Sequence, residues 1–250
     1  GNTNSAIGVY EGNKHLGNWT VSMAQERSSD EMGILLMSIL NYAGISPSQI
    51  TASIMCSVVP SAVYSVVHAI KRYFKIDTIL VGPGIKTGIN IKYENPREVG
   101  SDKIANAVGA LNLYGGPVII VDFGTATTFC AINRKADYLG GIICPGIKIS
   151  SEALFSKASM LPRIEITKPK HVIGRTTVSS MQSGILYGFT GQTDFIVNLM
   201  KEEMEEDDIK VVATGGRARI IAIESSTIDM VNPLLTLEGL KAVYQMNSIV

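Results

Sequence analysis

The sequence predicts an α/β protein, and three features of the chain lead to this prediction. Short apolar runs alternate with longer segments whose apolar residues recur at helical spacing. A turn rich in glycine and threonine precedes an apolar, strand-like run at two places, residues 1–3 and 124–127, as in an internal duplication. The 250 residues suffice for one large domain or two modest ones with a sizeable core.

The first half of the chain predicts strands and helices in alternation. Residues 30–44 begin with acidic side chains and end in glycine, which is typical of a helix. Pro60 ends a long apolar run, and the helix predicted after it carries Lys71 and Arg72 in its last turn, where cations stabilise a helix. Strands are predicted between Asn4 and Gly12 and over 18–22, 50–59 and 78–81, and helices over 30–44, 61–74 and 104–114.

Residues 117–132 are the most informative stretch. An apolar run ends in Asp122, a glycine and three threonines follow, and a second apolar run comes next, which predicts a strand, a tight turn and a returning strand. Gly124 lets the backbone approach a ligand, and Asp122 supplies a hard oxygen for a cation. The turn suits a polyphosphate and its cations, but an ordinary hairpin with a polar turn explains the same residues.

Asp102 is a second candidate group. The polar residues 93–103 predict a loop, and the helix over 104–114 places Asp102 at or near its N-terminus. There the carboxylate could cap the helix, a contribution of ~1 kcal/mol. It could equally accept a proton from a substrate hydroxyl. The residues alone leave both interpretations open.

The second half continues the α/β pattern. A strand with glycine breaks is expected over 137–146, a helix over 148–159, and a long helix from the hydroxyl-rich start at Thr176 towards Asp208. Residues 209–214 predict a strand that runs into Gly215 and Gly216, and 234–244 predict a final helix. The acidic run 201–208 is expected to be a solvated helix end rather than a metal site.

Composition excludes several classes of function. Lys and Arg together number 22, as do Asp and Glu, so no general positive field favours nucleic acid. Three scattered cysteines without a CxxC or HxxxH pattern indicate reduced side chains and no zinc site. No apolar run reaches the roughly 18 residues of a membrane span, and no signal peptide opens the chain. We therefore expect a soluble cytoplasmic protein.

Taken together, the motifs resemble the type III pantothenate kinase family of the acetate kinase/sugar kinase/Hsp70/actin superfamily. The resemblance covers nearly the whole chain in the right order. It rests on Gly1-Asn-Thr3-Asn4, Ser57-Val-Val-Pro60, Tyr93-x-x-Pro96-x-x-x-Gly100-Ser-Asp102-Lys103, Asp122-Phe-Gly-Thr125-Ala-Thr127, Gly140-Gly-x-Ile-x-Pro145-Gly146, Thr177-x-x-Ser180-Met-x-Ser183-Gly-x-x-Tyr187-Gly188, Ala213-Thr-Gly-Gly216 and Leu235-Thr-Leu-Glu-Gly-Leu240.

The resemblance implies a duplicated actin-like (ribonuclease H-like) ATPase fold, with two similar subdomains, 1–112 and 113–250, and a cleft between them. It implies ATP-dependent phosphorylation of pantothenate to 4′-phosphopantothenate, the first step of coenzyme A biosynthesis, by a homodimer whose pantothenate site is completed across the interface. No nucleic acid or membrane is implied as a partner. The cofactors are Mg²⁺ with ATP and a monovalent cation, K⁺ or NH₄⁺.

For the residues that match the family's motifs, the resemblance implies the roles that those positions have in the family. Asp102 matches the general base, and Asp122 matches the ligand of the monovalent cation. The remaining matches are Tyr93, Gly100, Ser101, Lys103 and Thr177 for pantothenate, and Gly1, Asn2, Thr3, Asn4 and Thr125 for ATP.

Three positions depart from the family pattern. Lys103 stands where arginine is usual, which keeps the charge but loses the bidentate fork, and Thr176 stands where asparagine is common. The family also has a strand and an aspartate before the first turn, and the chain begins at Gly1, after them. We expect that the strand and the aspartate were trimmed from the given sequence, because a protein without that core strand would leave a sheet edge uncovered. The alternative is that the protein lacks them and binds ATP poorly. The other open hypotheses are a non-catalytic regulatory or accessory relative, a kinase for another small hydroxylated substrate, and a phosphatase of similar topology.

Overall fold

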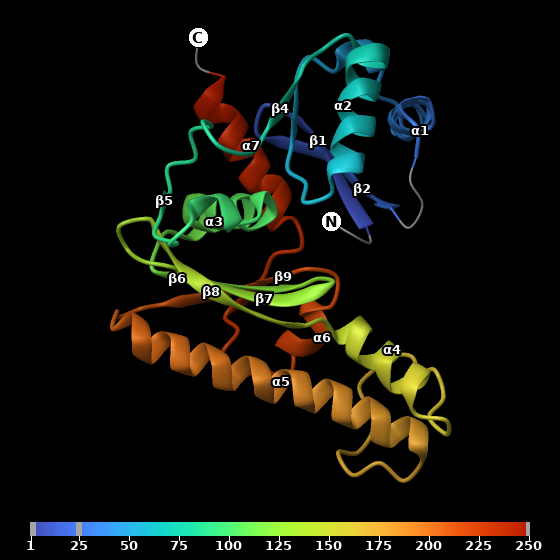
Figure 1. Cartoon of the computed structure of the whole chain (residues 1–250), viewed down its shortest axis with the longest axis vertical. Coiled ribbons are helices and arrows are strands. Elements are labelled where there is room, and N and C mark those ends of the chain that lie inside the picture. Colours follow the sequence, from blue (N-terminus) through green and yellow to red (C-terminus); the bar gives the residue numbers. More distant parts are fainter. Residues whose placement is uncertain (1–3, 24–26, 249–250) are drawn as a thin grey trace. The chain divides into compact units, whose positions relative to one another are not determined.

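The computed structural model describes residues 4–23 and 27–248, and the chain forms two compact units (Figure 1). Unit 1 comprises residues 1–87, 97–109 and 236–250, and unit 2 comprises residues 88–96 and 110–235. In the described part of the chain, no helix combines the length and the apolar character needed to cross a membrane.

Unit 2 is built on a mixed six-stranded sheet in the order β10-β9-β6-β7-β8-β5. Strands β6, β7 and β8 follow one another in the chain, and β7 pairs antiparallel with both of the others. The outer pairs are parallel: β9 with β6, β10 with β9, and β5 with β8. The strands are β5 (Asn90–Ile91), β6 (Val118–Phe123), β7 (Ala126–Ile132), β8 (Asp137–Pro145), β9 (Lys210–Thr214) and β10 (Met230–Val231).

Helix α5 lies along one face of this sheet (Figure 1). Its residues Leu186 and Val197 are fully buried and belong to one core with Val121 and Phe129 of the sheet. The near-continuous apolar run of β6 explains why that strand is buried on both sides. The helices of unit 2 are α4 (Ile147–Lys157), α5 (Thr177–Met204) and α6 (Ala218–Ala222).

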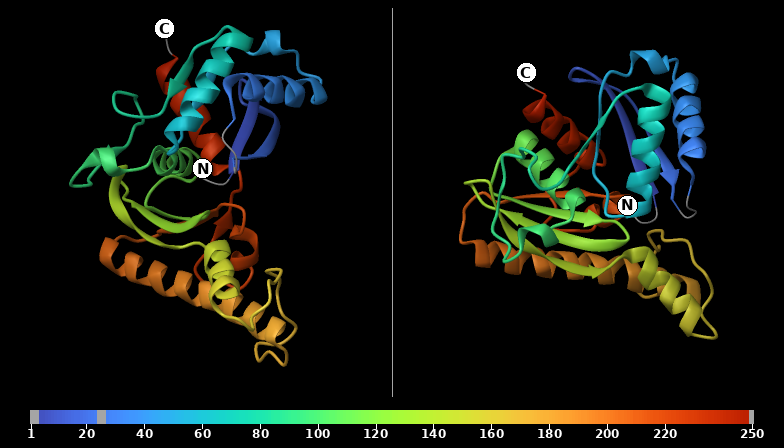
Figure 2. Two further views of the ribbon diagram at one scale, coloured as in Figure 1. Left: turned by 45° about the vertical axis from the view of Figure 1, so that its right-hand side comes forward. Right: turned by 45° about the horizontal axis from the view of Figure 1, so that its top comes forward.

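Unit 1 contains an antiparallel hairpin, β1 with β2, and a parallel pair, β3 with β4. Helices α1 and α2 pack against each other, as the right-hand view of Figure 2 shows, and Asp30 of α1 pairs with Arg72 of α2 at 2.9 Å. The elements are β1 (Asn4–Glu11), β2 (Lys14–Ser22), α1 (Ser29–Tyr42), η1 (Pro47–Gln49), β3 (Ser53–Met55), α2 (Pro60–Phe74), β4 (Thr78–Leu80) and α7 (Leu235–Asn247). The short helix η2 (Pro96–Glu98) and helix α3 (Ser101–Tyr114) each have residues in both units.

The order of elements repeats between the two halves of the chain. Each half contains a hairpin, β1–β2 or β7–β8, which is followed by α1 in the first half and by α4 and α5 in the second. A parallel strand pair with a helix between its strands comes next, β3-α2-β4 or β9-α6-β10, and a final helix, α3 or α7, completes the half. The predicted strand over 50–59 is wrong in extent, because pairing with the short β4 limits β3 to Ser53–Met55. The two units differ from the sequence-based division after residue 112 mainly in two places: residues 88–96 belong to unit 2, and residues 236–250, which include most of α7, belong to unit 1.

Candidate active site

The candidate residues divide between the two units. Three predicted ATP-binding residues, Gly1, Asn2 and Thr3, lie outside the described residues. Unit 1 holds Asn4, Gly100, Ser101, Asp102 and Lys103, and unit 2 holds Tyr93, Asp122, Thr125 and Thr177.

Asp102 lies in the first turn of α3 and is partly exposed. Its Oδ1 accepts a hydrogen bond from the backbone N–H of the next residue, Lys103, at 2.9 Å. A helix cap instead accepts from an amide two or three residues further on. Asp102 Oδ2 accepts no hydrogen bond from any described residue, so this oxygen is available to a substrate hydroxyl.

Gly100 provides the space that the Asp102 carboxylate occupies. A Cβ on Gly100 would lie 2.5 Å from Asp102 Oδ1, so any side chain there would displace the carboxylate. The carbonyl of Gly100 accepts from Ile104 N–H at 3.1 Å and thus begins the helix. Gly100 therefore sets both the start of α3 and the position of the candidate base.

Residues 56–59, which follow β3, lie close to the start of α3 and to Asp102. The Ser101 hydroxyl donates to the Ser57 carbonyl at 3.2 Å, and Ser57 Oγ accepts from Val59 N–H at 3.1 Å. Burial first, and then the negative charge of Asp102, raise the pKa of the Cys56 thiol to about 12. Cys56 is thus a neutral thiol at physiological pH and does not compete as a nucleophile.

Lys103 brings a positive charge next to the candidate base. Its side chain is partly buried and forms no ion pair with any described residue. An ammonium group supplies charge and up to three donors but no planar fork. The position can therefore attract a carboxylate or phosphate oxygen without bidentate geometry.

Asp122 occupies the end of β6, at the centre of the unit 2 sheet. Thr128 of β7 and Thr214 of β9 lie directly opposite it, so the three side chains share one face of three neighbouring strands. One carboxylate and two hydroxyls are hard oxygen donors of the kind that K⁺ or Mg²⁺ takes. Among the described residues no group of three His, Cys, Asp or Glu suits a metal, so a cation here would need hydroxyl, backbone or phosphate oxygens as well.

Glycines enclose the Asp122 turn. Gly215 directly follows β9 with a φ of 90°, and a Cβ there would lie 2.6 Å from Asp122 Oδ1. Gly124 N–H donates to the Ala126 carbonyl at 3.1 Å and closes the turn. Gly146 caps α4, and a Cβ on it would overlap the Thr125 carbonyl. The N-terminus of α4 therefore abuts the threonine turn, where its amides and dipole favour negative charge.

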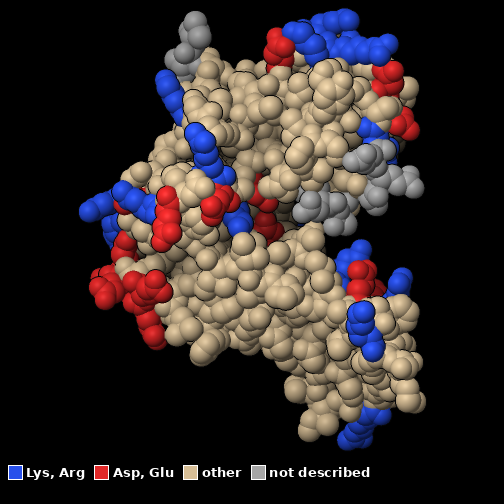
Figure 3. Space-filling view, in the orientation of Figure 1, with Lys and Arg blue, Asp and Glu red and all other residues tan. Residues whose placement is uncertain are grey.

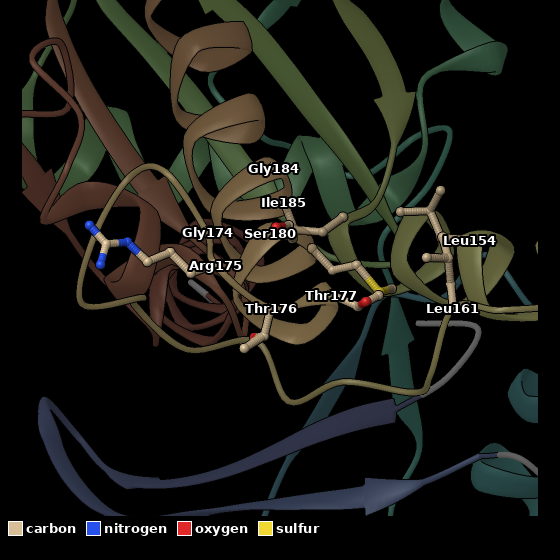
Figure 4. Close-up of a pocket in the computed structure, with 10 residues that line it drawn as sticks. Leu154, Leu161, Gly174, Arg175, Thr176, Thr177, Ser180, Gly184 and Ile185 are labelled. Atoms are coloured by element: carbon tan, nitrogen blue, oxygen red, sulfur yellow. The ribbon is translucent and has the colours of Figure 1, made fainter.

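Thr177 is the first residue of α5 and lines a solvent-open hollow of about 850 Å³ (Figure 4). Thr176 caps the helix by accepting from Ser179 N–H at 3.1 Å, which leaves the Thr177 hydroxyl outside the cap. Figure 4 shows the apolar side chains on one side of the hollow and the arginine on the other. The lining residues are Leu154, Leu161, Gly174, Arg175, Thr176, Thr177, Ser180, Met181, Gly184 and Ile185.

Tyr93 follows the two-residue strand β5 and is held through β8. The Lys92 N–H donates to the Tyr138 carbonyl at 2.9 Å, and the Tyr93 and Tyr138 rings lie 6.2 Å apart. The Asp137 carboxylate accepts from the Asn90 amide at 2.7 Å. Hydrogen bonds from the Asn133 amide and then from Asn90 hold the pKa of Asp137 below its usual value. This ionised carboxylate fixes β5 and with it the start of the Tyr93 loop.

Sequence reasoning found the carboxylates but missed the residues that shape their surroundings. Thr128, Thr214 and Gly215 approach Asp122 only because β6, β7 and β9 pair in a particular register. The Thr-Gly-Gly sequence at the end of β9 was a weak signal for such a role, and Thr128 was marked only as one of the three threonines that follow Asp122.

The repeated topology is that of the actin-like ATPase fold, which confirms the predicted fold class. A conserved protein of Campylobacter jejuni assigned to the Baf family of transcriptional activators has a similar structure, with a TM-score of 0.54 at 17% identity over 92% of this chain and 90% of that one. The activator of 2-hydroxyisocaproyl-CoA dehydratase from Clostridium difficile, solved with bound ADPNP, has a TM-score of 0.53 at 13% identity over 98% and 91%.

Sequence comparison then gives the family. Residues 1–199 match the profile of the family described as Type III pantothenate kinase. The type III pantothenate kinase of Bacillus cytotoxicus is 53% identical over 249 residues, which is 100% of this chain and 95% of that protein. The chain belongs to the type III pantothenate kinase family, as the motifs predicted.

Proposed function

We propose that this protein transfers the γ-phosphoryl group of ATP to pantothenate and so produces 4′-phosphopantothenate for coenzyme A synthesis. The observation that carries the proposal is the 53% identity, over the whole chain, to the type III pantothenate kinase of Bacillus cytotoxicus. The actin-like fold supports it through nucleotide binding, because the dehydratase activator of similar fold was solved with an ATP analogue.

Asp102 is the general base of this proposal. It accepts the proton of the primary hydroxyl as that oxygen attacks the γ-phosphorus, while the bond from phosphorus to the bridging oxygen of ADP breaks. The proposal is supported by the free Oδ2 and by the space that Gly100 leaves. Lys103 would add positive charge beside the reacting groups.

The residues proposed to bind pantothenate are Ser101, Lys103, Tyr93 and Thr177, with Gly100. Ser101 and Lys103 follow Gly100 at the start of α3, and Tyr93 and Thr177 belong to unit 2. The fixed start of the Tyr93 loop and the solvent-open position of Thr177 support these roles. Because Lys103 lacks the guanidinium fork, we expect weaker orientation of the substrate than an arginine would give.

We propose the residues of the two glycine-threonine turns as ATP-binding residues. They are Asn4 and Thr125, which the structure describes, and Gly1, Asn2 and Thr3, which lie outside the described residues. The oxygens of Asp122, Thr128 and Thr214 would hold a monovalent cation, K⁺ or NH₄⁺. When bound, this cation and the Mg²⁺ of ATP neutralise phosphate charge.

We also propose a homodimer that works in the cytoplasm, where its ATP is available. Several apolar side chains of unit 2 are exposed, among them Ile143 at 64%, Ile173 at 81% and Phe195 at 67%. In Figure 3 the charged side chains of unit 2 gather towards its two ends, with uncharged surface between them. Exposed apolar surface of this kind favours association, which light scattering of the purified protein would measure as twice the mass of one chain.

The activity is tested with purified protein, ATP, Mg²⁺ and pantothenate in potassium buffer. We expect 4′-phosphopantothenate by mass spectrometry, with one ADP formed per product. Binding of pantothenate without transfer would refute the proposal and favour a non-catalytic accessory protein. Phosphorylation of another hydroxylated compound, but not of pantothenate, in a substrate panel would refute the assigned substrate.

A further inference from the structure

Helix α7 is the last element of the chain, yet it packs within unit 1 against the helix that carries Asp102. A Cβ on Gly239 would overlap the carbonyl of Ala105 and lie 3.1 Å from the amide nitrogen of Gly109. Ala105 and Gly109 are one turn apart on α3, so three small residues let the two helix backbones touch. Ala105 is itself three residues after Asp102, on the next turn of α3.

A polar contact fixes α7 to α3 beside this backbone contact. The Thr236 hydroxyl donates to Asn106 Oδ1 at 2.6 Å, and Asn106 is only 3% exposed. A hydrogen bond buried in this way stabilises the contact between the two helices. It therefore prevents α7 from sliding or rotating freely along α3.

The other side of α7 holds strand β1. Tyr10 of β1 donates its hydroxyl to Glu238 Oε1 at 3.1 Å, and Lys241 pairs with Glu238 Oε2 at 2.6 Å. The Lys241 ammonium lies 5.1 Å from the centre of the Tyr10 ring. Burial, with the charge of Glu238, raises the pKa of Tyr10, so the phenol remains a donor. A Cβ on Gly8 would lie 3.0 Å from Leu237 Cδ1, so the strand packs directly on the helix.

We propose that α7 is a positioning element for phosphoryl transfer, in which Gly239 and the Tyr10–Glu238 hydrogen bond set the place of Asp102 relative to strand β1. The inference rests on the proposed kinase function. Strand β1 begins at Asn4, the described end of the proposed phosphate turn, and α3 begins at the proposed base. Because transfer requires the two groups in a near-attack arrangement, a shift of about 1 Å costs on the order of 100-fold in rate.

Gly239→Ala tests the backbone contact. Gly191→Ala is the matched control, because Gly191 also lies inside a helix and a Cβ there would meet nothing within 4 Å. Titration calorimetry measures the concentration of sites that bind pantothenate. The maximal rate is divided by this concentration to give kcat per site, so that unfolded protein does not lower the value. We expect Gly239→Ala to lower kcat per site on the order of 10- to 100-fold with little change in the KM for pantothenate, and Gly191→Ala to match the wild type.

Tyr10→Phe and Glu238→Gln keep the inference testable if Gly239→Ala does not fold. Tyr42→Phe is their control, because Tyr42 is 90% exposed. We expect each single change to lower kcat per site by several-fold, and the double variant to lose less than the product of the two because they share one hydrogen bond. Wild-type values of kcat per site in all the folded variants would overturn the inference while leaving the kinase function intact. Absence of turnover by the wild type would refute the kinase function and this inference with it.

Discussion

Replacing Gly215 by alanine should remove the response of the enzyme to potassium. The new methyl group would lie 2.6 Å from Asp122 Oδ1 and 2.7 Å from the carbonyl carbon of Phe123, where no carbon atom fits. The carboxylate or the end of β9 must therefore move. Because Asp122 is the only charged oxygen donor proposed for the cation, its displacement should weaken cation binding directly.

The expected loss of stability has two sources. Gly215 has a φ of 90°, which an L-residue adopts at a cost of about 1–2 kcal/mol. Overpacking against a fixed backbone adds about 1–3 kcal/mol. The free energy of unfolding should fall by about 2–5 kcal/mol, and the melting temperature by roughly 4–20 °C for a chain of this size.

Gly216→Ala is the matched control, one residue further on. A Cβ on Gly216 would meet nothing within 4 Å, so this change should leave stability within about 0.5 kcal/mol of the wild type. The phosphorylation rate is measured in potassium and in sodium, at a temperature where both variants are folded. The wild type and Gly216→Ala should be faster in potassium, and Gly215→Ala should respond equally to both salts. A Gly215→Ala variant with wild-type stability and an unchanged potassium-to-sodium ratio would refute this reasoning.

Two further predictions concern carboxylates that hold structure in unit 2. Partial burial raises the pKa of Asp194, but hydrogen bonds from Ser225, Ser226 and Thr227 outweigh it and keep the pKa below the usual value. Asp194→Asn should therefore cost about 1 kcal/mol of unfolding free energy at pH 7. That difference should begin to shrink as the pH falls below about 4, the usual pKa of an aspartate, and should disappear below the lower pKa of folded Asp194, where the wild-type carboxylate also becomes neutral. A pH-independent difference in urea denaturation would contradict this. Asp137→Asn should raise the KM for pantothenate several-fold with little change in kcat, because β5 and the Tyr93 loop would lose their anchor; steady-state kinetics with an unchanged KM would contradict it.

The sequence predicted those elements whose signals are local. The hairpin over 117–132 appears as β6 and β7, because two apolar runs around a glycine-threonine turn have few other ways to pair. The long helix α5 was predicted from its hydroxyl-rich start, and Thr176 caps it as expected, although the helix ends at Met204, before Asp208. Asp102 was placed correctly near a helix start, but only the structure separates it from a capping residue, since its hydrogen bond goes to the next amide.

The features that sequence could not give depend on contacts between distant parts of the chain. Strand β5 has two residues and exists because β8 pairs with it, so no periodicity marks it. Gly146 meets the turn at Thr125, and Gly239 meets Ala105, through packing that no spacing in the sequence encodes. The same reason explains why α7, the last helix, was expected with the second half of the chain although it belongs to unit 1.

The most direct test of the central claim is the rate of phosphoryl transfer in Asp102→Asn, measured by rapid quench at saturating ATP and pantothenate in potassium buffer. Asparagine keeps the shape of the side chain but cannot accept the proton, so the rate should fall by about 100- to 10,000-fold while pantothenate still binds. Asp77→Asn serves as the control, because Asp77 is an exposed carboxylate of the same unit, and it should transfer at the wild-type rate. A wild-type transfer rate in Asp102→Asn would contradict the assignment of Asp102 as the general base.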